Sequence, residues 1–166
     1  MTLDDLPDGE RVFIDSTIFV YHFSGVSLQC RNFLERCENG QLKGVTSSVV
    51  LAEVAHRLMM IEAVARKLVS GGNLAKKLRG KPEVVKKLQS YNQQIERIPL
   101  MGIKTEDLDL RTVLSSEEVR RHHSLLVYDS IVAASAMTAG IQSLATADRD
   151  FQRVHEINCF SPTDIA

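Results

Sequence analysis

Four carboxylates stand in apolar stretches at widely separated points of the chain: Asp15, Glu53, Asp129 and Asp148. Charged side chains rarely enter such surroundings unless they are paired or bind a metal ion. No Lys or Arg lies close enough in sequence to pair with Asp15 or Asp129. A set of oxygen ligands without nitrogen or sulfur favours a hard divalent cation, Mg²⁺ or Mn²⁺. The four residues together therefore suggest a metal-dependent acidic site.

Each of these acids also has a purely structural explanation. Asp15 could cap a local turn, and Asp148 could belong to the turn that follows it. Asp129 could favour the N-terminus of its own helix. Glu53 could face solvent. Taken singly, each structural explanation is the stronger one; it is the occurrence of all four acids in apolar frames that favours a shared site.

Short apolar runs separated by helical patterns must position these acids. The predicted strands are 11–14, 44–46, 99–103, 143–146 and 157–160. The predicted helices begin at Ser27, at Ser47 or Ser48 (running to about Leu68), at Pro82 (running to Ile98), at Thr105 (running to Leu114), at Ser115 and at Tyr128 (running to Thr138). Strands that alternate with helices predict a parallel α/β sheet covered on both faces.

The predicted strand ends bring the acids toward one edge. Asp15 ends the first strand and Asp148 follows the fourth, while Asp129 opens the helix that precedes the fourth strand. Glu53 lies in the helix after the second strand. Sites in open α/β sheets form at the carboxyl ends of strands, so this placement agrees with a common site.

Composition limits the class of protein. The chain has 166 residues, of which 44% are hydrophobic and 25% charged, and this predicts one ordinary globular domain over 1–166. No apolar run exceeds four residues, which excludes a membrane span of about 20 residues. Three cysteines and an acidic N-terminus without a signal-peptide pattern favour the cytoplasm.

A basic segment at about 66–98 departs from the net charge of −1. It holds nine basic and two acidic residues, a net charge of +7, and leaves −8 on the rest of the chain. Such a segment could bind a polyanion such as RNA, through Lys76, Lys77, Lys86 and Lys87. Charge alone favours the alternative, a solvated helical hairpin.

Four motifs in order resemble the PIN domain family. They are the stretches 13–19 (FIDSTIF), 47–54 (SSVVLAEV), 126–136 (LVYDSIVAASA) and 143–151 (SLATADRDF). The resemblance covers the chain from Val12 to Phe160 and is greatest to VapC-type toxins of toxin–antitoxin pairs. It implies a three-layer α/β/α PIN-like fold with a central, mainly parallel, short-stranded sheet. The long basic segment departs from the compact toxins.

The resemblance also implies an activity, the Mg²⁺- or Mn²⁺-dependent hydrolysis of RNA phosphodiester bonds. Asp15 and Asp129 are then direct metal ligands, Asp148 is a ligand directly or through water, and Glu53 is a further ligand or the group that accepts a proton. The supporting residues are Asp150, at lower rank, with Ser16, Thr17 and Thr146. Arg149 could contact phosphate or, as the slightly favoured alternative, pair with Asp150 or Glu156.

The implied partners are an RNA substrate, a cognate antitoxin and a second copy of the chain, with no membrane. Two alternatives remain within the family: a housekeeping RNA-processing nuclease and a non-catalytic scaffold that binds RNA or protein. A phosphatase of the haloacid dehalogenase type is disfavoured, because it needs a second aspartate at the position of Thr17.

Overall fold

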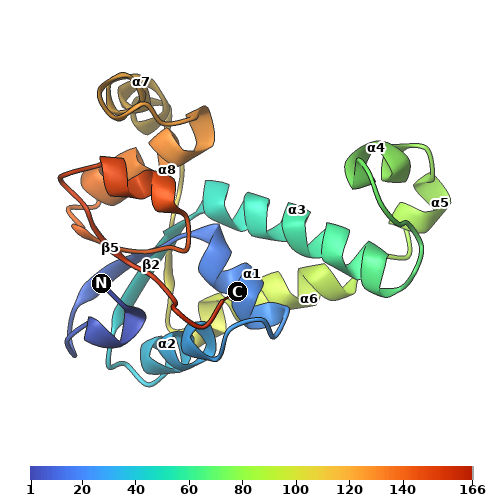
Figure 1. The fold of residues 1–166 in the computed structure, drawn as a ribbon, viewed down its shortest axis with the longest axis horizontal. Helices are drawn as coiled ribbons and strands as arrows, with labels where there is room; N and C mark the ends of the chain where they lie inside the picture. Colours follow the sequence, from blue (N-terminus) through green and yellow to red (C-terminus); the bar gives the residue numbers. More distant parts are fainter. Residues whose placement is uncertain (166) are drawn as a thin grey trace.

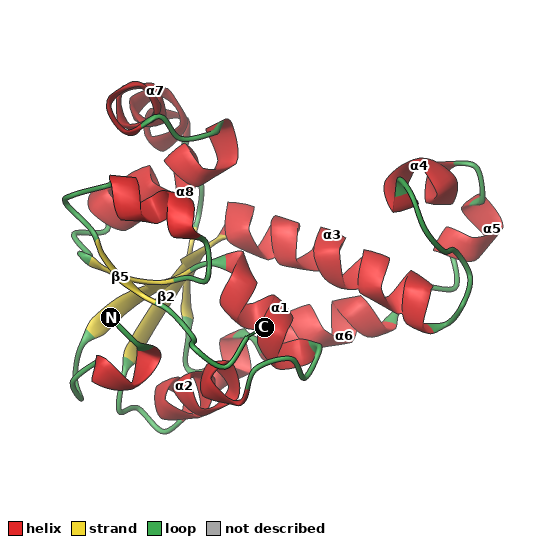
Figure 2. Ribbon diagram, viewed as in Figure 1, coloured by secondary structure: helices red, strands yellow, loops and turns green. Residues whose placement is uncertain are grey.

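A five-stranded parallel sheet forms the centre of the computed structural model, which describes residues 1–165 (Figure 2). The strands are β1 (Arg11–Ile14), β2 (Lys43–Ser47), β3 (Lys104–Glu106), β4 (Ser143–Ala145) and β5 (Asn158–Phe160). Their order is β3-β2-β1-β4-β5, and every neighbouring pair is parallel. The predicted short-stranded parallel sheet is therefore confirmed.

Helices cover both faces of this sheet. They are α1 (Ser16–Phe23), α2 (Leu28–Glu38), α3 (Ser48–Ala65), α4 (Leu74–Arg79), α5 (Pro82–Val85), α6 (Ser90–Arg97), α7 (Leu110–His123) and α8 (Val127–Thr138). Short 3₁₀ helices span Leu3–Asp5, Pro99–Met101 and Arg149–Arg153. Figure 1 shows α7 and α8 on one face and α1 and α2 on the other, which confirms the three layers. No helix within residues 1–165 is both long and apolar enough to cross a membrane.

The burial of the central strand β1 agrees with its continuous apolar sequence. Val12, Phe13 and Ile14 are fully buried, as expected for a parallel strand covered on both faces. The α2 pattern is also confirmed, since Ser27 accepts a hydrogen bond from the Cys30 N–H and the buried stripe includes Cys30 and Cys37. Burial raises the pKa of the Cys37 thiol to about 12, so this cysteine behaves as a small hydrophobic residue.

The predicted strand at 99–103 is wrong. Residues Pro99–Met101 form a 3₁₀ helix and Gly102 adopts a left-handed conformation at φ 69°. A side chain at Gly102 would bring its Cβ within 3.2 Å of the Cys37 carbonyl oxygen. The chain therefore turns tightly here, and the strand begins only at Lys104.

The predicted helix boundaries at Thr105 and Ser115 are also wrong. Thr105 lies in strand β3, and a single helix, α7, begins at Leu110 and runs through Ser115. Its N-cap is Asp109, whose carboxylate accepts the Thr112 N–H at 2.7 Å. The Ser115 hydroxyl donates to the Thr112 carbonyl inside the helix. A mid-helix serine can satisfy its hydroxyl in this way, so the apparent capping box at Ser115 was misleading.

The basic segment is more divided than predicted. Helix α3 ends at Ala65, and the helix predicted from Pro82 to Ile98 is interrupted between α5 and α6. We call residues 66–89, with α4 and α5, the basic lobe. Its Val69, Leu78 and Leu88 form a small separate core with Ala63 of α3. The lobe lies at the far end of α3 from the sheet, and α6 returns along α3 (Figure 1).

Candidate active site

The acids gather where the sheet changes its winding direction. The chain runs outward from β1 to β2 and β3, and then returns to β4 on the other side of β1. Such a switch point opens a crevice at the carboxyl ends of the two central strands. Asp15 follows β1 directly, and Asp148 lies three residues after the end of β4.

Asp15 is held by a set of hydrogen bonds to one oxygen. The residue is only 4% exposed, and its Oδ2 accepts from the Thr17 N–H at 3.3 Å, the Thr17 hydroxyl at 2.7 Å and the Thr146 hydroxyl at 2.9 Å. Asp15 is thereby the N-cap of α1, a helix that the sequence patterns did not predict. Within residues 1–165 no donor hydrogen-bonds to Oδ1, which leaves this oxygen available to a ligand.

The two threonines also fix the loop after β4. The Thr17 hydroxyl accepts the Ala147 N–H at 2.9 Å, and the Thr146 hydroxyl accepts the Asp148 N–H at 3.0 Å. Asp148 in turn accepts the Asp150 N–H at 2.8 Å, which caps the 3₁₀ helix beyond it. The backbone that carries Asp148 is therefore tied to Asp15 through side-chain hydroxyls.

Asp129 shows that the acids share one electrostatic environment. It lies in the first turn of α8 and is half-buried. Burial raises the pKa of its carboxyl to about 6, and the charges of Asp148, Asp15, Glu53 and Asp150 raise it in the same direction. Like charges disfavour the ionised form of a neighbouring carboxyl group, so Asp129 lies within the electrostatic influence of these four acids.

An arginine that the sequence analysis missed lies beside Glu53. The Arg57 Nη1 is 3.6 Å from the Glu53 carboxylate and 3.3 Å from the Ser16 hydroxyl. Arg57 thus links α3 to the start of α1, next to Asp15. The signal was present in the sequence, because residues four apart on a helix face one another.

The donor chemistry of the site fits a hard divalent cation. All five side chains offer carboxylate oxygens, and Asp15 Oδ1 is free of protein donors among the described residues. No three His, Cys, Asp or Glu side chains within residues 1–165 converge closely enough to form a ready-made metal cage.

The predicted substrate residues do not lie with the acids, except Arg149. Arg149 is exposed between Asp148 and Asp150, and the Asp150 carboxylate pairs with Arg153 at 2.9 Å. The four predicted lysines belong to the basic lobe, at the far end of α3: Lys76 and Lys77 on α4, with Lys86 and Lys87 between α5 and α6. The Lys77 ammonium donates to the carbonyl groups of Ser70 and Gly71, so it holds the lobe together.

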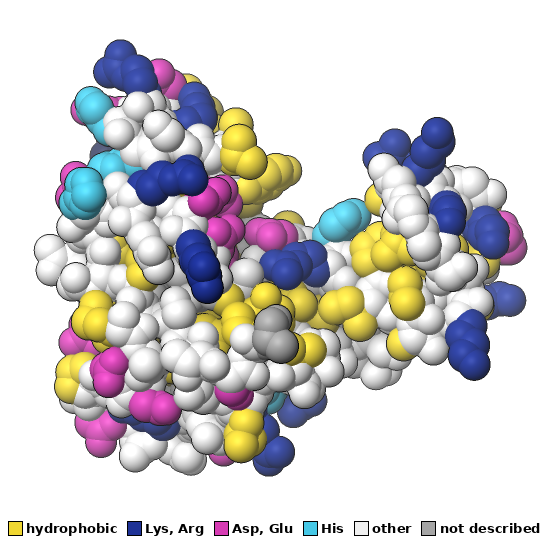
Figure 3. Space-filling view, viewed as in Figure 1, with side chains coloured by type: hydrophobic (Ala, Val, Ile, Leu, Met, Phe, Trp, Pro, Cys, Tyr) yellow, Lys and Arg dark blue, Asp and Glu magenta, His cyan; other side chains and the backbone are white. Residues whose placement is uncertain are grey.

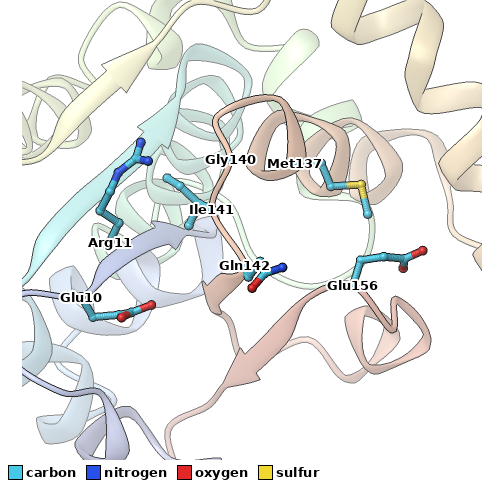
Figure 4. A pocket seen from close by; sticks show the side chains of 7 residues that line it. All are labelled: Glu10, Arg11, Met137, Gly140, Ile141, Gln142 and Glu156. Carbon is cyan, nitrogen blue, oxygen red and sulfur yellow. The ribbon is translucent and has the colours of Figure 1, made fainter.

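A separate pocket lies at the opposite edge of the sheet. It has a volume of about 370 Å³ and is lined by residues that include Glu10, Arg11 and Gln142, next to the amino ends of β1 and β4 (Figure 4). Two of its polar side chains are already engaged, since Arg11 donates to the Ala139 carbonyl and Glu10 accepts from Ser143. This pocket contains none of the acids described above.

Comparisons with known proteins bear on the fold and the family of the chain. Ribonuclease VapC2 of Methanocaldococcus jannaschii is 26% identical over 144 residues, which are 87% of this chain and 89% of the relative. The solved structure of VapBC2 from Rickettsia felis, bound to a promoter DNA fragment, has a TM-score of 0.60 at 18% identity and covers 92% of this chain and 98% of its own. Mycobacterium tuberculosis VapC20, a toxin that cleaves the sarcin–ricin loop, has a TM-score of 0.59 at 14% identity, covering 87% and 95%. The family model of the PIN domain matches residues 12–157, and the chain belongs to this family.

Proposed function

We propose that this protein is an endoribonuclease that hydrolyses RNA phosphodiester bonds at the acidic site, with Mg²⁺ or Mn²⁺, as the toxin of a type II toxin–antitoxin pair. The observation that supports the proposal is the link between two acids at the switch point of the sheet: the buried Thr146 hydroxyl donates to Asp15 and accepts the Asp148 N–H. The raised pKa of Asp129, to which the charges of Asp148, Asp15, Glu53 and Asp150 contribute, supports it further. A carboxyl group whose pKa is raised by burial and by neighbouring charges is a candidate for a functional site.

The relatives support the reaction and the partner. The curated relative is named a ribonuclease, and solved structures with this fold include a toxin–antitoxin complex from Klebsiella pneumoniae and VapBC-1 from Haemophilus influenzae. We extend from them a cognate antitoxin as partner and the cytoplasm as location. A housekeeping RNA-processing nuclease is the second candidate, favoured by the long basic segment. The retained acids count against a non-catalytic scaffold.

In the proposed reaction, three of the acids bind the metal ion. A divalent cation supplies charge neutralisation at the phosphate and lowers the pKa of the attacking water. Asp15, fixed by Thr17 and Thr146, presents its free Oδ1 toward such a ligand. Asp129 and Asp148 complete the ligand set.

Glu53 and Arg149 have further roles in the proposed reaction, toward the attacking water and the phosphate. Glu53, which pairs with Arg57, is a further metal ligand or the group that accepts the proton of the water. Arg149, exposed beside Asp148, contacts the phosphate. An arginine at this place offsets part of the acidic charge that a phosphodiester meets.

The test compares the purified full chain with Asp129→Asn on single-stranded and looped RNA. We expect cleavage with Mg²⁺ or Mn²⁺, none in EDTA, and a loss of at least about 100-fold in Asp129→Asn. Asp107→Asn, which removes an exposed carboxylate elsewhere, is the matched control and keeps full activity. Cleavage that persists undiminished in EDTA contradicts the metal mechanism.

The toxin role has its own test. Expression of the chain in a bacterial host should arrest growth, while Asp129→Asn should not, and the product of a neighbouring small reading frame should restore growth by binding the chain. Harmless expression of a protein that is active in vitro would favour the housekeeping nuclease.

A further inference from the structure

The basic lobe stands well away from the acids. Glu53 and the end of α3 at Ala65 are twelve residues apart, and at 1.5 Å per residue this part of the helix is about 18 Å long. The lobe begins beyond that point (Figure 1). Any contact that it makes with a substrate is therefore remote from the reacting phosphate.

The lobe directs its charge outward. Its apolar residues pack into their own small core, and Figure 3 shows Lys and Arg side chains around its surface, opposite the acidic patch on the main body. Within residues 1–165, the only salt bridge formed by segment 66–98 joins Arg66 to Glu62. The lysines of the lobe are thus not neutralised by carboxylates of the described chain.

A pocket of about 770 Å³ opens on this lobe. Its cationic lining is Lys67, Lys76, Lys77 and Lys81, beside Ser70 and Asn73, with apolar Leu68 and Val69. The volume lies in the range of ligand sites, about 300–1,000 Å³.

The four lysines of the pocket differ in their roles. Lys77 donates to two backbone carbonyls, and Lys81 donates to the Leu68 carbonyl at 3.5 Å. The ammonium groups of Lys67 and Lys76 make no such bond among the described residues, and both side chains are exposed. Two lysines therefore build the pocket and two remain to bind a ligand.

We propose that this pocket holds a nucleotide of the RNA strand that is cut at the acids, so that the protein grips its substrate at two places. The inference rests on the proposed function and adds a substrate class to it, RNA long enough to reach from the acids to the lobe. The two free lysines attract a phosphate, and the partly buried Leu68 beside them offers an apolar surface to a base. The part of α3 between Glu53 and Ala65 alone is about 18 Å long, so one nucleotide cannot reach both places.

This arrangement also answers an electrostatic difficulty. The acidic site repels a polyanion, whereas the lobe concentrates positive charge: its one acid is Glu83, and none of its lysines forms a salt bridge with a described carboxylate. An acidic peptide would meet the same lysines but has no planar base for the apolar lining, so RNA is the favoured ligand.

The test measures binding of fluorescein-labelled oligouridylates of about four to about sixteen nucleotides, a range that brackets single-strand sites. The full chain is used in EDTA to prevent cleavage. The pocket variant is Lys67→Gln with Lys76→Gln, and the matched control is Lys86→Gln with Lys87→Gln, which removes the same charge from the lobe outside the pocket. Lys76→Gln alone serves as a second variant, because Lys67 has a left-handed backbone at φ 56°.

We expect the longer RNA to bind the wild type more tightly than the short one. The pocket variant should lose this length dependence, and the slope of log K against log salt should fall by about 1.4, or 0.7 per phosphate contact. The control pair should weaken binding but keep the length dependence. Equal effects of both pairs, or an unchanged length dependence in the pocket variant, would overturn the inference.

Two further arms separate the possible failures. If the long RNA binds through the pocket but is never cut with Mn²⁺, the inference stands and the proposed function fails. If oligoglutamate displaces the long RNA as well as unlabelled oligouridylate does, the pocket is a general anion site and the inference is overturned.

Discussion

Asp129 offers the most direct test of the site at the scale of single residues. Its pKa in the folded protein, about 6, lies above the ordinary value of 3.8. A carboxyl with a raised pKa contributes stability that is fully present below about pH 3.8 and is lost as the pH rises through about 6. Asp129→Asn removes this loss, so we expect the free energy of unfolding at neutral pH to rise by about 1–2 kcal/mol, after allowance for screening at a half-buried group.

Urea unfolding of wild type and Asp129→Asn in EDTA checks this expectation. The gain in stability should be larger near pH 7.5 than near about pH 4, because at about pH 4 the carboxyl is largely protonated in the folded protein and still partly protonated in the unfolded protein. Added Mn²⁺ should stabilise the wild type more than the variant, because only the folded site binds the ion. A variant that is neutral at both pH values, with an equal response to Mn²⁺, would show that Asp129 serves only its helix.

Thr146 connects the two central acids and gives a second prediction. Its hydroxyl donates to Asp15 and accepts the Asp148 N–H, and the side chain is fully buried. Thr146→Val keeps the shape but removes both bonds, so we expect a loss of about 1–3 kcal/mol in stability and a lower kcat at unchanged RNA affinity. Thr46→Val is the control, because Thr46 is equally buried but bonds only the Ile14 carbonyl. If Thr46→Val lowers kcat as strongly, the effect is one of stability and not of the site.

At the scale of elements, the predictable parts are those whose signals are local. β1 is a continuous apolar run, α2 has a serine cap and a regular stripe, and α8 is an alanine-rich helix that ends before a glycine. Their boundaries agree with the sequence patterns to within one or two residues. Helix α1 was missed because its cap, Asp15, was assigned to chemistry, although one carboxylate can serve both purposes.

The failed predictions depend on distant contacts. The turn at Gly102 is required by the approach of the α2 backbone, and no local pattern contains that information. The helix is interrupted between α5 and α6, and there the carboxylate of Glu62 on α3 accepts hydrogen bonds from the backbone N–H groups of Gln89 and Tyr91. In the acidic site, the acids were predicted from the apolar residues around them, whereas Arg57 was overlooked. In the basic lobe, Lys77 was predicted to bind RNA, and its bonds to backbone carbonyls depend on a fold that the sequence did not reveal.

Glu62 is therefore expected to control how firmly α6 and the basic lobe are held. It is 8% exposed, and burial raises the pKa of its carboxyl, but the N–H groups of Tyr91 and Gln89 and the Arg66 guanidinium outweigh burial and lower the pKa overall. Stability from this lowered pKa is present above the ordinary value of 4.5 and is lost as the pH falls through the folded pKa. Glu62→Gln turns an amide NH₂ toward these donors and should cost about 1–3 kcal/mol.

Hydrogen exchange distinguishes a local from a global effect of Glu62→Gln. We expect faster exchange of the amides of α4 to α6, with those of β1 unchanged, since the lobe has a separate core. Glu83→Gln, at an exposed acid of α5, should leave both regions unchanged. Uniformly faster exchange throughout the chain would mean that the lobe and the main body unfold as one unit.

At the scale of the whole molecule, α7 exposes apolar side chains and buries polar ones, the reverse of the usual pattern of a surface helix. The residues that it buries are Thr112 and Ser116, whereas Leu110 and Leu114 are 71% and 66% exposed and Val113 lies between them. Leu110, Val113 and Leu114 have the spacing of one helix face. A contiguous exposed apolar face of this kind marks a protein contact.

We expect this face of α7 to join two copies of the chain, because a twofold contact lets the same apolar face cover itself. Leu110→Lys with Leu114→Lys places like charges in that contact and should convert a dimer into a monomer in light scattering at micromolar concentration. Leu100→Lys, at a residue 78% exposed on the 3₁₀ helix Pro99–Met101, adds a charge elsewhere and should leave the dimer intact. A wild type that is monomeric at these concentrations, or a double variant that remains dimeric, would exclude α7 as the contact, and the apolar face would then have to be covered by a different protein.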